Sequence, residues 1–270
     1  MFKVISMYDS LTDDPLIQYY DETVGISGEA EVKWYLGKVR RFGGPVLDLA
    51  CGTGRIALIL ANEGLNVDAL DLSQGMQARF RNKLADEPLD IQSRIKIHRL
   101  SMSDFQLNKQ FNSILCIDAF FHNLNEQAAI NCMTCVAKHL APESRFFFNV
   151  PNPNQEFLQK CIESKGKKWQ TRGKYALKKP DYSVVVEEAS AVDLAKQLIF
   201  TKLRFTLRDD ADNLMKSSES GWTTRYMYEK QYVDLIDKCR LEIESLVGTY
   251  TNEPVASTSQ LIFQLKLKRE

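Results

Sequence analysis

A glycine pair stands where the chain could hold a nucleotide-like molecule. Gly52 and Gly54 follow the apolar run 46–49, and apolar residues recur at helical spacing after Gly54. Because glycine has no side chain, a ligand can approach the loop backbone closely, and the free N–H groups at the start of a helix point toward it. Strand, glycine loop and helix together predict a nucleotide-type site. The alternative is that the glycines serve only the turn.

Asp71 is a second candidate ligand-binding residue. It closes the next apolar segment, 66–72, and lies 17 positions after Gly54. This separation is close to the ~20 residues at which a carboxylate at the tip of the second strand accepts hydrogen bonds from ribose hydroxyls. Ser73 is the expected cap of the helix that follows. Met76 on that helix could pack against an adenine ring, although a methionine at this spacing is more often a core residue.

The remaining pattern is that of alternating strands and helices. Further strands are expected at 95–100, 111–117, 145–150, 241–250 and 260–268, with helices at about 126–140 and 229–239. This alternation is typical of a parallel sheet covered on both faces. The expected fold is α/β, with a doubly wound, mostly parallel, Rossmann-like sheet of seven strands. Ligands bind such sheets beyond the carboxyl ends of the strands, where Ser101, Asp118 and His122 stand.

The composition of the chain changes after residue 153. The segments 182–192, 196–208 and 216–228 are rich in β-branched and aromatic residues, which favours a small antiparallel sheet. We therefore expect three parts. Residues 1–28 form an N-terminal lid, residues 29–153 and 229–270 form the cofactor-binding domain, and residues 154–228 form an inserted sheet that covers the substrate side.

Composition narrows the classes of partner. The 35 basic and 35 acidic residues cancel, so no global field recruits nucleic acid or an anionic membrane. No window approaches the ~20 apolar residues of a membrane span. A cytoplasmic protein with a small-molecule partner is expected, and a homodimer is compatible with this. The six cysteines lie in expected core elements, which favours reduced thiols. Cys132 and Cys135 share one helical pattern, and no metal site is expected.

Three motifs resemble those of a known family. They are Val-Leu-Asp-Leu-Ala-Cys-Gly-Thr-Gly-Arg at 46–55, Leu-Asp-Leu-Ser-x-x-Met at 70–76 and Met-Ser-Asp-Phe at 102–105. In combination they resemble the class I S-adenosylmethionine-dependent methyltransferases over roughly residues 30–153. The later antiparallel segments are similar to the sheet that some small-molecule methyltransferases of this class insert there.

The resemblance implies S-adenosylmethionine as cofactor and S-adenosylhomocysteine as product. It places Asp48 and the Ala50 carbonyl near the amino group of the cofactor, and Gly52 and Gly54 under its sugar and methionine portion. It places Asp71 on the ribose. The other implied cofactor-binding residues are Leu72, Met76 and the Met102 amide around the adenine, together with Ser101 and Asp118. Ser101 stands where the family often has an acidic residue, which weakens or removes one hydrogen bond to the adenine.

Two competing functions remain open. A dinucleotide-dependent oxidoreductase would suit Gly52-x-Gly54-x-x-Ala57. A carboxylate at Asp48, inside the first strand, is unfavourable beside a pyrophosphate but favourable beside an ammonium group. A methyltransferase-fold module that has lost the reaction and only binds a partner is the other alternative. Asp48 and Asp71 argue against it, because packing alone requires no carboxylates at strand ends.

The implied reaction is in-line displacement of a sulfonium methyl by a nitrogen or oxygen atom of a small molecule, in which alignment and exclusion of water contribute most. His122 and Tyr20 are the candidate catalytic residues, with His122 as a base or a substrate contact. A histidine that only caps the next helix is the alternative.

We expect the acceptor over the carboxyl ends of the first and fourth strands, roofed by residues 8–20 and the inserted sheet. The candidate substrate contacts are Phe121, Trp222, Arg225 and Tyr226. Neighbours on a strand alternate in facing, so only one of Arg225 and Tyr226 is expected to point straight inward. The alternative is that Trp222 and Tyr226 only pack the inserted sheet against the domain.

Overall fold

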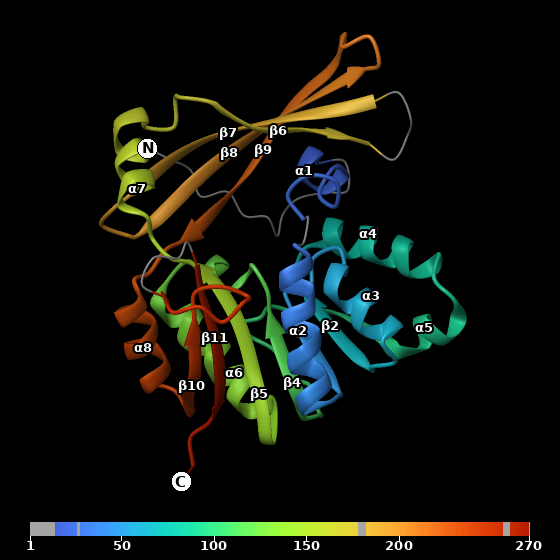
Figure 1. Ribbon diagram of the computed structural model, residues 1–270, viewed down its shortest axis with the longest axis vertical. Helices are drawn as coiled ribbons and strands as arrows, with labels where there is room; N and C mark the ends of the chain where they lie inside the picture. Colours follow the sequence, from blue (N-terminus) through green and yellow to red (C-terminus); the bar gives the residue numbers. More distant parts are fainter. Residues whose placement is uncertain (1–13, 26–27, 178–181, 256–259, 270) are drawn as a thin grey trace.

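A mostly parallel sheet forms the centre of the computed structural model, which describes residues 14–25, 28–177, 182–255 and 260–269 (Figure 1). In the described residues this main sheet has seven strands in the order β10-β11-β5-β4-β1-β2-β3. Strand β11 is antiparallel to both neighbours, whereas β1 to β5 pair in parallel. The strands are β1 (Val46–Leu49), β2 (Val67–Asp71), β3 (Ile95–Arg99), β4 (Phe111–Cys116), β5 (Leu140–Pro151), β10 (Leu241–Val247) and β11 (Gln260–Leu267). The expected α/β fold is confirmed.

Helices cover both faces of the main sheet. Val46 and Leu47 on β1 point to opposite faces and join different apolar clusters. The cluster around Val46 includes residues of α2 (Glu29–Phe42), α3 (Arg55–Asn62), α4 (Gln74–Ala85) and α5 (Leu89–Arg94). The cluster around Leu47 includes residues of α6 (Glu126–His139) and α8 (Glu229–Asp237). Strands that are buried on both faces have apolar residues at successive positions, which explains the mostly apolar sequences of β1 and β4.

The glycine loop between β1 and α3 depends on left-handed backbone. Gly52 has φ 56° and Gly54 has φ 77°, backbone conformations that residues other than glycine rarely adopt. A Cβ atom built on Gly54 would lie 2.2 Å from the ring of Phe80 on α4, whereas one built on Gly52 would meet no described atom within 4 Å. Gly54 is therefore required for packing. Gly52 leaves open space above the loop.

A second, antiparallel sheet lies above the carboxyl ends of the main sheet (Figure 1). It has the order β6-β7-β8-β9, with β6 (Gln170–Ala176), β7 (Tyr182–Asp193), β8 (Leu198–Asp209) and β9 (Leu214–Arg225). Helix α7 (Gln155–Ser164) packs against β7. The sequence pattern does not predict α7 or β6. Only Leu158 and Cys161 are buried on α7, and β6 has no fully buried residue.

Residues 14–25 of the N-terminal segment lie between the two sheets (Figure 1). Asp14 caps the short helix α1 (Pro15–Gln18) by accepting a hydrogen bond from the Leu16 amide at 2.8 Å. The Leu16 side chain is buried against Val184, Leu203 and other residues of the second sheet. Tyr8, which was expected in this lid, lies outside the described residues.

The described helices and the cysteines bear on two further expectations, the absence of a membrane span and the presence of reduced thiols. In the parts of the chain that the structure describes, none of the helices combines the length and apolar character that crossing a bilayer requires. The six cysteines are free thiols, and Cys116 and Cys132 are fully buried.

We predict that Gly54→Ala destabilises the protein by roughly 2 to 4 kcal/mol, because the new methyl group would meet Phe80 and the backbone would stay left-handed. Gly37→Ala is the matched control, since a Cβ at this α2 position meets no described atom within 4 Å. It is expected to raise stability by about 0.5 to 1 kcal/mol through helix propensity. Urea denaturation of both variants checks this, and equal stability of the two would contradict the packing role of Gly54.

Candidate functional site

Asp71 ties the end of β2 to the glycine loop and to the start of α4. Its carboxylate accepts a hydrogen bond from the Gly52 amide at 2.8 Å and another from the Ser73 amide at 2.7 Å. Burial raises the pKa of Asp71, while the amides of Ser73, Gly52 and Leu72 act to lower it. A carboxylate has about four acceptor sites, so these three amides leave at least one of them free. Asp71 can therefore hold the loop and still accept hydrogen bonds from a ligand hydroxyl.

Asp48 is a buried carboxyl group with an unpaired oxygen. It is 3% exposed, and its Oδ2 atom has no hydrogen-bond partner among the described residues. Burial raises its pKa to about 7, the charge of Arg55 lowers it, and the nearby Asp71 raises it. An ionised carboxylate in such surroundings is stable only beside a cation or a donor. A ligand with a cationic group would supply that partner.

The geometry around the glycine loop fits a ligand with an ammonium group and a hydroxylated sugar. Gly52 leaves open space over its Cα atom, and the Asp48 and Asp71 carboxylates lie at the ends of the adjacent strands β1 and β2. Ala50 also has a left-handed backbone, with φ 54°. These observations place four of the predicted cofactor-binding residues around one loop. Their roles stay predictions.

The predicted adenine-binding residues are mostly buried. Met76 and Met102 are 2% and 5% exposed, and Leu72 is half-buried. The Asn123 amide nitrogen lies 3.7 Å from the Met102 sulfur. The hydroxyl of Ser101 lies 3.0 Å from that of Ser103. Ser103 therefore already uses part of the hydrogen-bonding capacity of Ser101.

An ionic network centred on Asp21 holds the N-terminal segment over the glycine loop. The Asp21 carboxylate accepts hydrogen bonds from the Thr53 hydroxyl at 2.5 Å, from Arg79 at 2.7 Å and from Lys83 at 3.1 Å. Arg79 also donates to Glu22 at 2.9 Å. Burial opposes ionisation of Asp21, but its donors hold its pKa below the usual value. The sequence shows the acidic residues of this segment but gives no sign of their partners on α4.

A cavity of about 530 Å³ lies between the main sheet and the second sheet. It opens over the carboxyl end of the fourth strand, β4, as expected, and over that of β5 rather than that of the first strand, since Asp118 and residues 151–154 line it. Seven predicted site residues share its wall: Tyr20, Asp118, Phe121, His122, Trp222, Arg225 and Tyr226. We call this the acceptor cavity. Asp118, predicted on the cofactor side, therefore also faces the opposite side of the site.

His122 is an electrically neutral imidazole at physiological pH. It ends the short helix η2 (Phe120–His122) and hydrogen-bonds the Thr223 main chain. Burial lowers its pKa to about 4. Tyr20 is the opposite case, because burial raises its pKa to about 12, while the charge of Arg55 acts to lower it. At pH 7 the neutral His122 ring can therefore accept a hydrogen bond through its unprotonated nitrogen, and Tyr20 can donate one.

The expectation that only one of Arg225 and Tyr226 points straight inward stays a prediction. Both line the acceptor cavity. Strand β9 ends at Arg225, and Tyr226 lies beyond it with its amide donating to the Gln197 carbonyl at 3.0 Å. The alternation of a pleated strand does not apply past the end of that strand.

Sequence reasoning missed Asn149 and the partners of Asp118. The Asn149 side chain donates to Asp118 Oδ1 at 2.5 Å and accepts from the Asp118 amide at 2.9 Å. Arg55 lies 3.8 Å from Asp118 Oδ2 and pairs with Glu31 at 2.9 Å. These contacts hold Asp118 in its left-handed conformation, φ 50°. Asn149 lies inside an apolar strand, which is the one signal that could have drawn attention to it.

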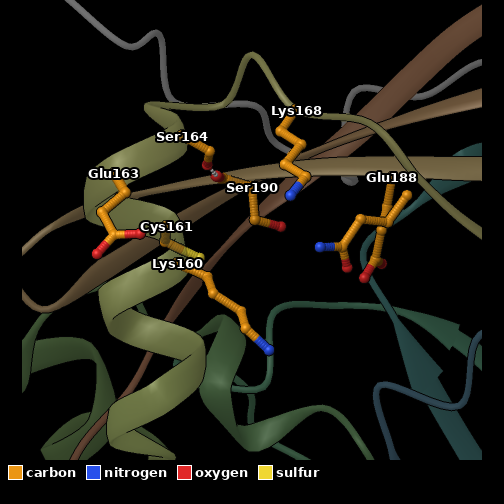
Figure 2. A pocket seen from close by; sticks show the side chains of 8 residues that line it. Lys160, Cys161, Glu163, Ser164, Lys168, Glu188 and Ser190 are labelled. Carbon is orange, nitrogen blue, oxygen red and sulfur yellow. Dashed lines mark hydrogen bonds between the residues drawn. The ribbon is translucent and has the colours of Figure 1, made fainter.

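A second hollow of about 420 Å³ adjoins the acceptor cavity, with which it shares Glu188 and Ser190 (Figure 2). Lys160 and Lys168 line it, and the Ser164 hydroxyl donates to the Ser190 carbonyl at 3.3 Å. Glu188 pairs with Arg172 of β6 at 3.0 Å. This hollow, between α7 and β7, was not expected from the sequence.

Comparison with known proteins bears on the same region. Residues 46–143 match the family model described as "Methyltransferase domain". The chain is 28% identical over 107 residues to "Putative methyltransferase YqeM" of Bacillus subtilis (strain 168), covering 40% of this chain and 42% of that protein. It is 31% identical over 99 residues to "dTDP-3-amino-3,6-dideoxy-alpha-D-glucopyranose N,N-dimethyltransferase" of Streptomyces fradiae, covering 36% of each. The matches thus span well under half of these curated relatives.

Solved structures extend the similarity of fold to nearly the whole chain. The CcbJ methyltransferase from Streptomyces caelestis superposes with a TM-score of 0.75 at 20% identity, covering 96% of this chain and 99% of that one. The sugar N-methyltransferase KedS8 from Streptoalloteichus sp. ATCC 53650 superposes with a TM-score of 0.70 at 18% sequence identity, covering 100% of this chain and 98% of that one. The glycopeptide N-methyltransferase MtfA complexed with S-adenosylmethionine superposes with a TM-score of 0.58 at 20% sequence identity, covering 91% of this chain and 96% of that one. The methyltransferase fold is confirmed, and the family resemblance is confirmed over residues 46–143.

The raised pKa of Asp48 predicts a pH-dependent stability. Between its ordinary value of 3.8 and about 7, the folded protein keeps a proton on Asp48 that the unfolded chain has lost. The free energy of unfolding should therefore fall as pH rises through this window. Asp48→Asn removes the titrating group, so its stability relative to the wild type should increase from pH 4 to pH 7 by on the order of 3 kcal/mol. Denaturation of both proteins without added ligand measures this. A difference that stays constant with pH would contradict the burial of an unpaired carboxyl.

Proposed function

We propose that this chain transfers a methyl group from S-adenosylmethionine to a nitrogen atom of a small molecule. Its residues 46–143 match a methyltransferase domain, and its fold is that of the class I S-adenosylmethionine-dependent methyltransferases. S-adenosylhomocysteine is the second product. The observation that carries the proposal is the buried, unpaired Oδ2 atom of Asp48, on the strand that leads into the open glycine loop.

The cofactor side of the site suits this molecule chemically. Its ammonium group would pair with the Asp48 carboxylate, and pairing would lower the raised pKa of that group. A ribose hydroxyl would donate to the acceptor site of Asp71 that its three amide donors leave free. Leu72, Met76 and Met102 offer apolar surface to the adenine. When bound, the cofactor supplies a methyl group on a positively charged sulfur, which is electrophilic without further activation.

The choice of nitrogen rests on the relatives. The Streptomyces fradiae protein is named an N,N-dimethyltransferase, and KedS8 and MtfA are N-methyltransferases. An amine reacts only when its lone pair is free of a proton. His122 is neutral at pH 7 because burial holds its pKa at about 4, and the Asp118 side chain is 52% exposed toward solvent. Either group can accept a hydrogen bond from an N–H of the amine and so orient its lone pair.

The chain contributes mainly alignment and exclusion of water. The N-terminal segment, fixed by Asp21 to Thr53 and Arg79, brings Tyr20 to the wall of the acceptor cavity. Phe121 and Trp222 give that wall its aromatic surface. A nucleophile held between these groups would approach the methyl group in a dry, fixed geometry, and such positioning can supply a large share of the rate enhancement.

We predict that Asp71→Ala weakens the binding of S-adenosylhomocysteine by about tenfold to a hundredfold, since a charge-assisted hydrogen bond contributes roughly 1.5 to 3 kcal/mol. Because the Gly52 and Ser73 amides also lose their acceptor, the melting temperature should fall as well. Asp48→Asn should weaken binding to a similar extent. Isothermal titration calorimetry measures the affinities, with Asp90→Ala, an exposed carboxylate on α5, as control. No heat from the wild type with either cofactor form would favour the inactive binding module.

We predict that Tyr20→Ala, His122→Ala and Trp222→Ala each lower methyl transfer to the first amine found in an acceptor screen by at least about tenfold, because a displaced nucleophile loses alignment. Affinity for S-adenosylhomocysteine should change less than about threefold, since these residues line the acceptor cavity. Tyr182→Ala is the matched control, because Tyr182 is an exposed aromatic residue of the same sheet outside the cavity wall. Full turnover in all three variants, or a loss only of thermal stability, would show that the acceptor binds elsewhere.

A further inference from the structure

Two buried side-chain atoms lack a hydrogen-bond partner among the residues that the structure describes. They are Asp48 Oδ2 and Arg225 Nη1. Asp48 lies on the cofactor side, where the proposed function gives it a cationic partner. Arg225 lines the acceptor cavity. Polar groups in folded proteins are seldom left unpaired when buried, and the exceptions are often completed by a ligand.

The carboxylates nearest to Arg225 are engaged with lysines. Arg225 also borders a small cavity of about 180 Å³ behind the acceptor cavity, together with Glu126, Asp234 and Lys238. Glu126 pairs with Lys238. Asp234 pairs with Lys230 at 3.1 Å. These ion pairs lie on exposed side chains, and no carboxylate of the described residues forms an ion pair with Arg225.

The other charges of the acceptor cavity are balanced within the protein. Arg172 pairs with Glu188 at 3.0 Å. Asp118 accepts from Asn149 at 2.5 Å and has Arg55 at 3.8 Å. Arg225 thus carries a positive charge that has no ion-pair partner in the described part of the acceptor cavity. Across the small cavity, Lys238 and, less strongly, Arg225 lower the pKa of the exposed Glu126.

We propose that Arg225 binds an oxyanion on the methyl acceptor, so that the acceptor is an amine that also carries a carboxylate or phosphate group. This inference rests on the proposed function. A guanidinium group presents two parallel N–H donors that match the two oxygens of such a group. Arg225 ends β9, at the margin of the aromatic wall formed by Trp222 and Tyr226. The acidic group would be held there, and the amine would face Phe121 and His122.

The test compares probes that differ in one acidic group. Glucosamine is paired with glucosamine 6-phosphate, and cyclohexylamine with trans-4-aminocyclohexanecarboxylate. Each is titrated by calorimetry into protein saturated with S-adenosylhomocysteine. In the wild type, the acidic member of at least one pair should bind at least about tenfold more tightly. Arg225→Gln should abolish that preference and leave the affinity for the neutral member unchanged. Arg225→Lys should retain part of the preference, because it keeps the charge but loses the paired donors.

Two matched variants locate the effect. Arg172→Gln removes a cation of the same cavity that already has a carboxylate partner, and Lys168→Gln removes an exposed cation of the adjoining hollow (Figure 2). Both should keep the preference for the acidic probe. Equal affinity within both pairs in the wild type, or no binding of either acidic probe, would overturn the assignment. A preference that survives Arg225→Gln, or that is lost with Arg172→Gln or Lys168→Gln, would overturn it as well. Affinity for S-adenosylhomocysteine is measured on the same samples. If it is absent, the proposed cofactor is wrong, and the same titrations on the free protein still decide the role of Arg225.

Discussion

The hydrogen bonds from the Gly52 and Ser73 amides to the Asp71 carboxylate fix the relative positions of three elements. They join the loop after β1, the end of β2 and the first turn of α4. A buried carboxylate must be satisfied by donors, and here those donors belong to the backbone that a ligand would contact. The left-handed glycines, the contact of Phe80 with Gly54 and the open space over Gly52 all depend on this arrangement. The site is thus a property of the fold rather than of flexible side chains.

The sequence predicts the main sheet well because its signals are local. Apolar runs such as 46–49 and 111–117 and the glycines between elements correspond directly to strands and turns in the structure. It does not predict α7 and β6, because their side chains are largely exposed and carry little apolar periodicity. Their structure is set by packing against β7, which no local pattern records. The same limit explains why the expected strand at 216–228 is shifted by a few residues from the observed Leu214–Arg225.

The candidate site was predictable to the extent that its residues follow strand ends. Asp48, Asp71 and Asp118 are visible in this way, because parallel strands bring their carboxyl ends to one edge. The partners of these residues were not predictable. Asp21 meets Arg79 and Lys83 across about 60 residues of sequence, and Asn149 meets Asp118 across 31. The unpaired nitrogen of Arg225 is a still subtler feature, since an absent partner can be recognised only when every neighbour has been placed in space.

The second sheet leaves the main domain after β5 and returns to it just before α8. Residues 154–228 supply the larger part of the wall of the acceptor cavity, whereas the glycine loop and its carboxylates all precede residue 72. Selection can therefore act on the two regions separately. Mutations within the insertion can reshape the wall of the acceptor cavity while the glycine loop and its carboxylates stay unchanged. Protein engineers can use the same division by exchanging this segment between homologous scaffolds.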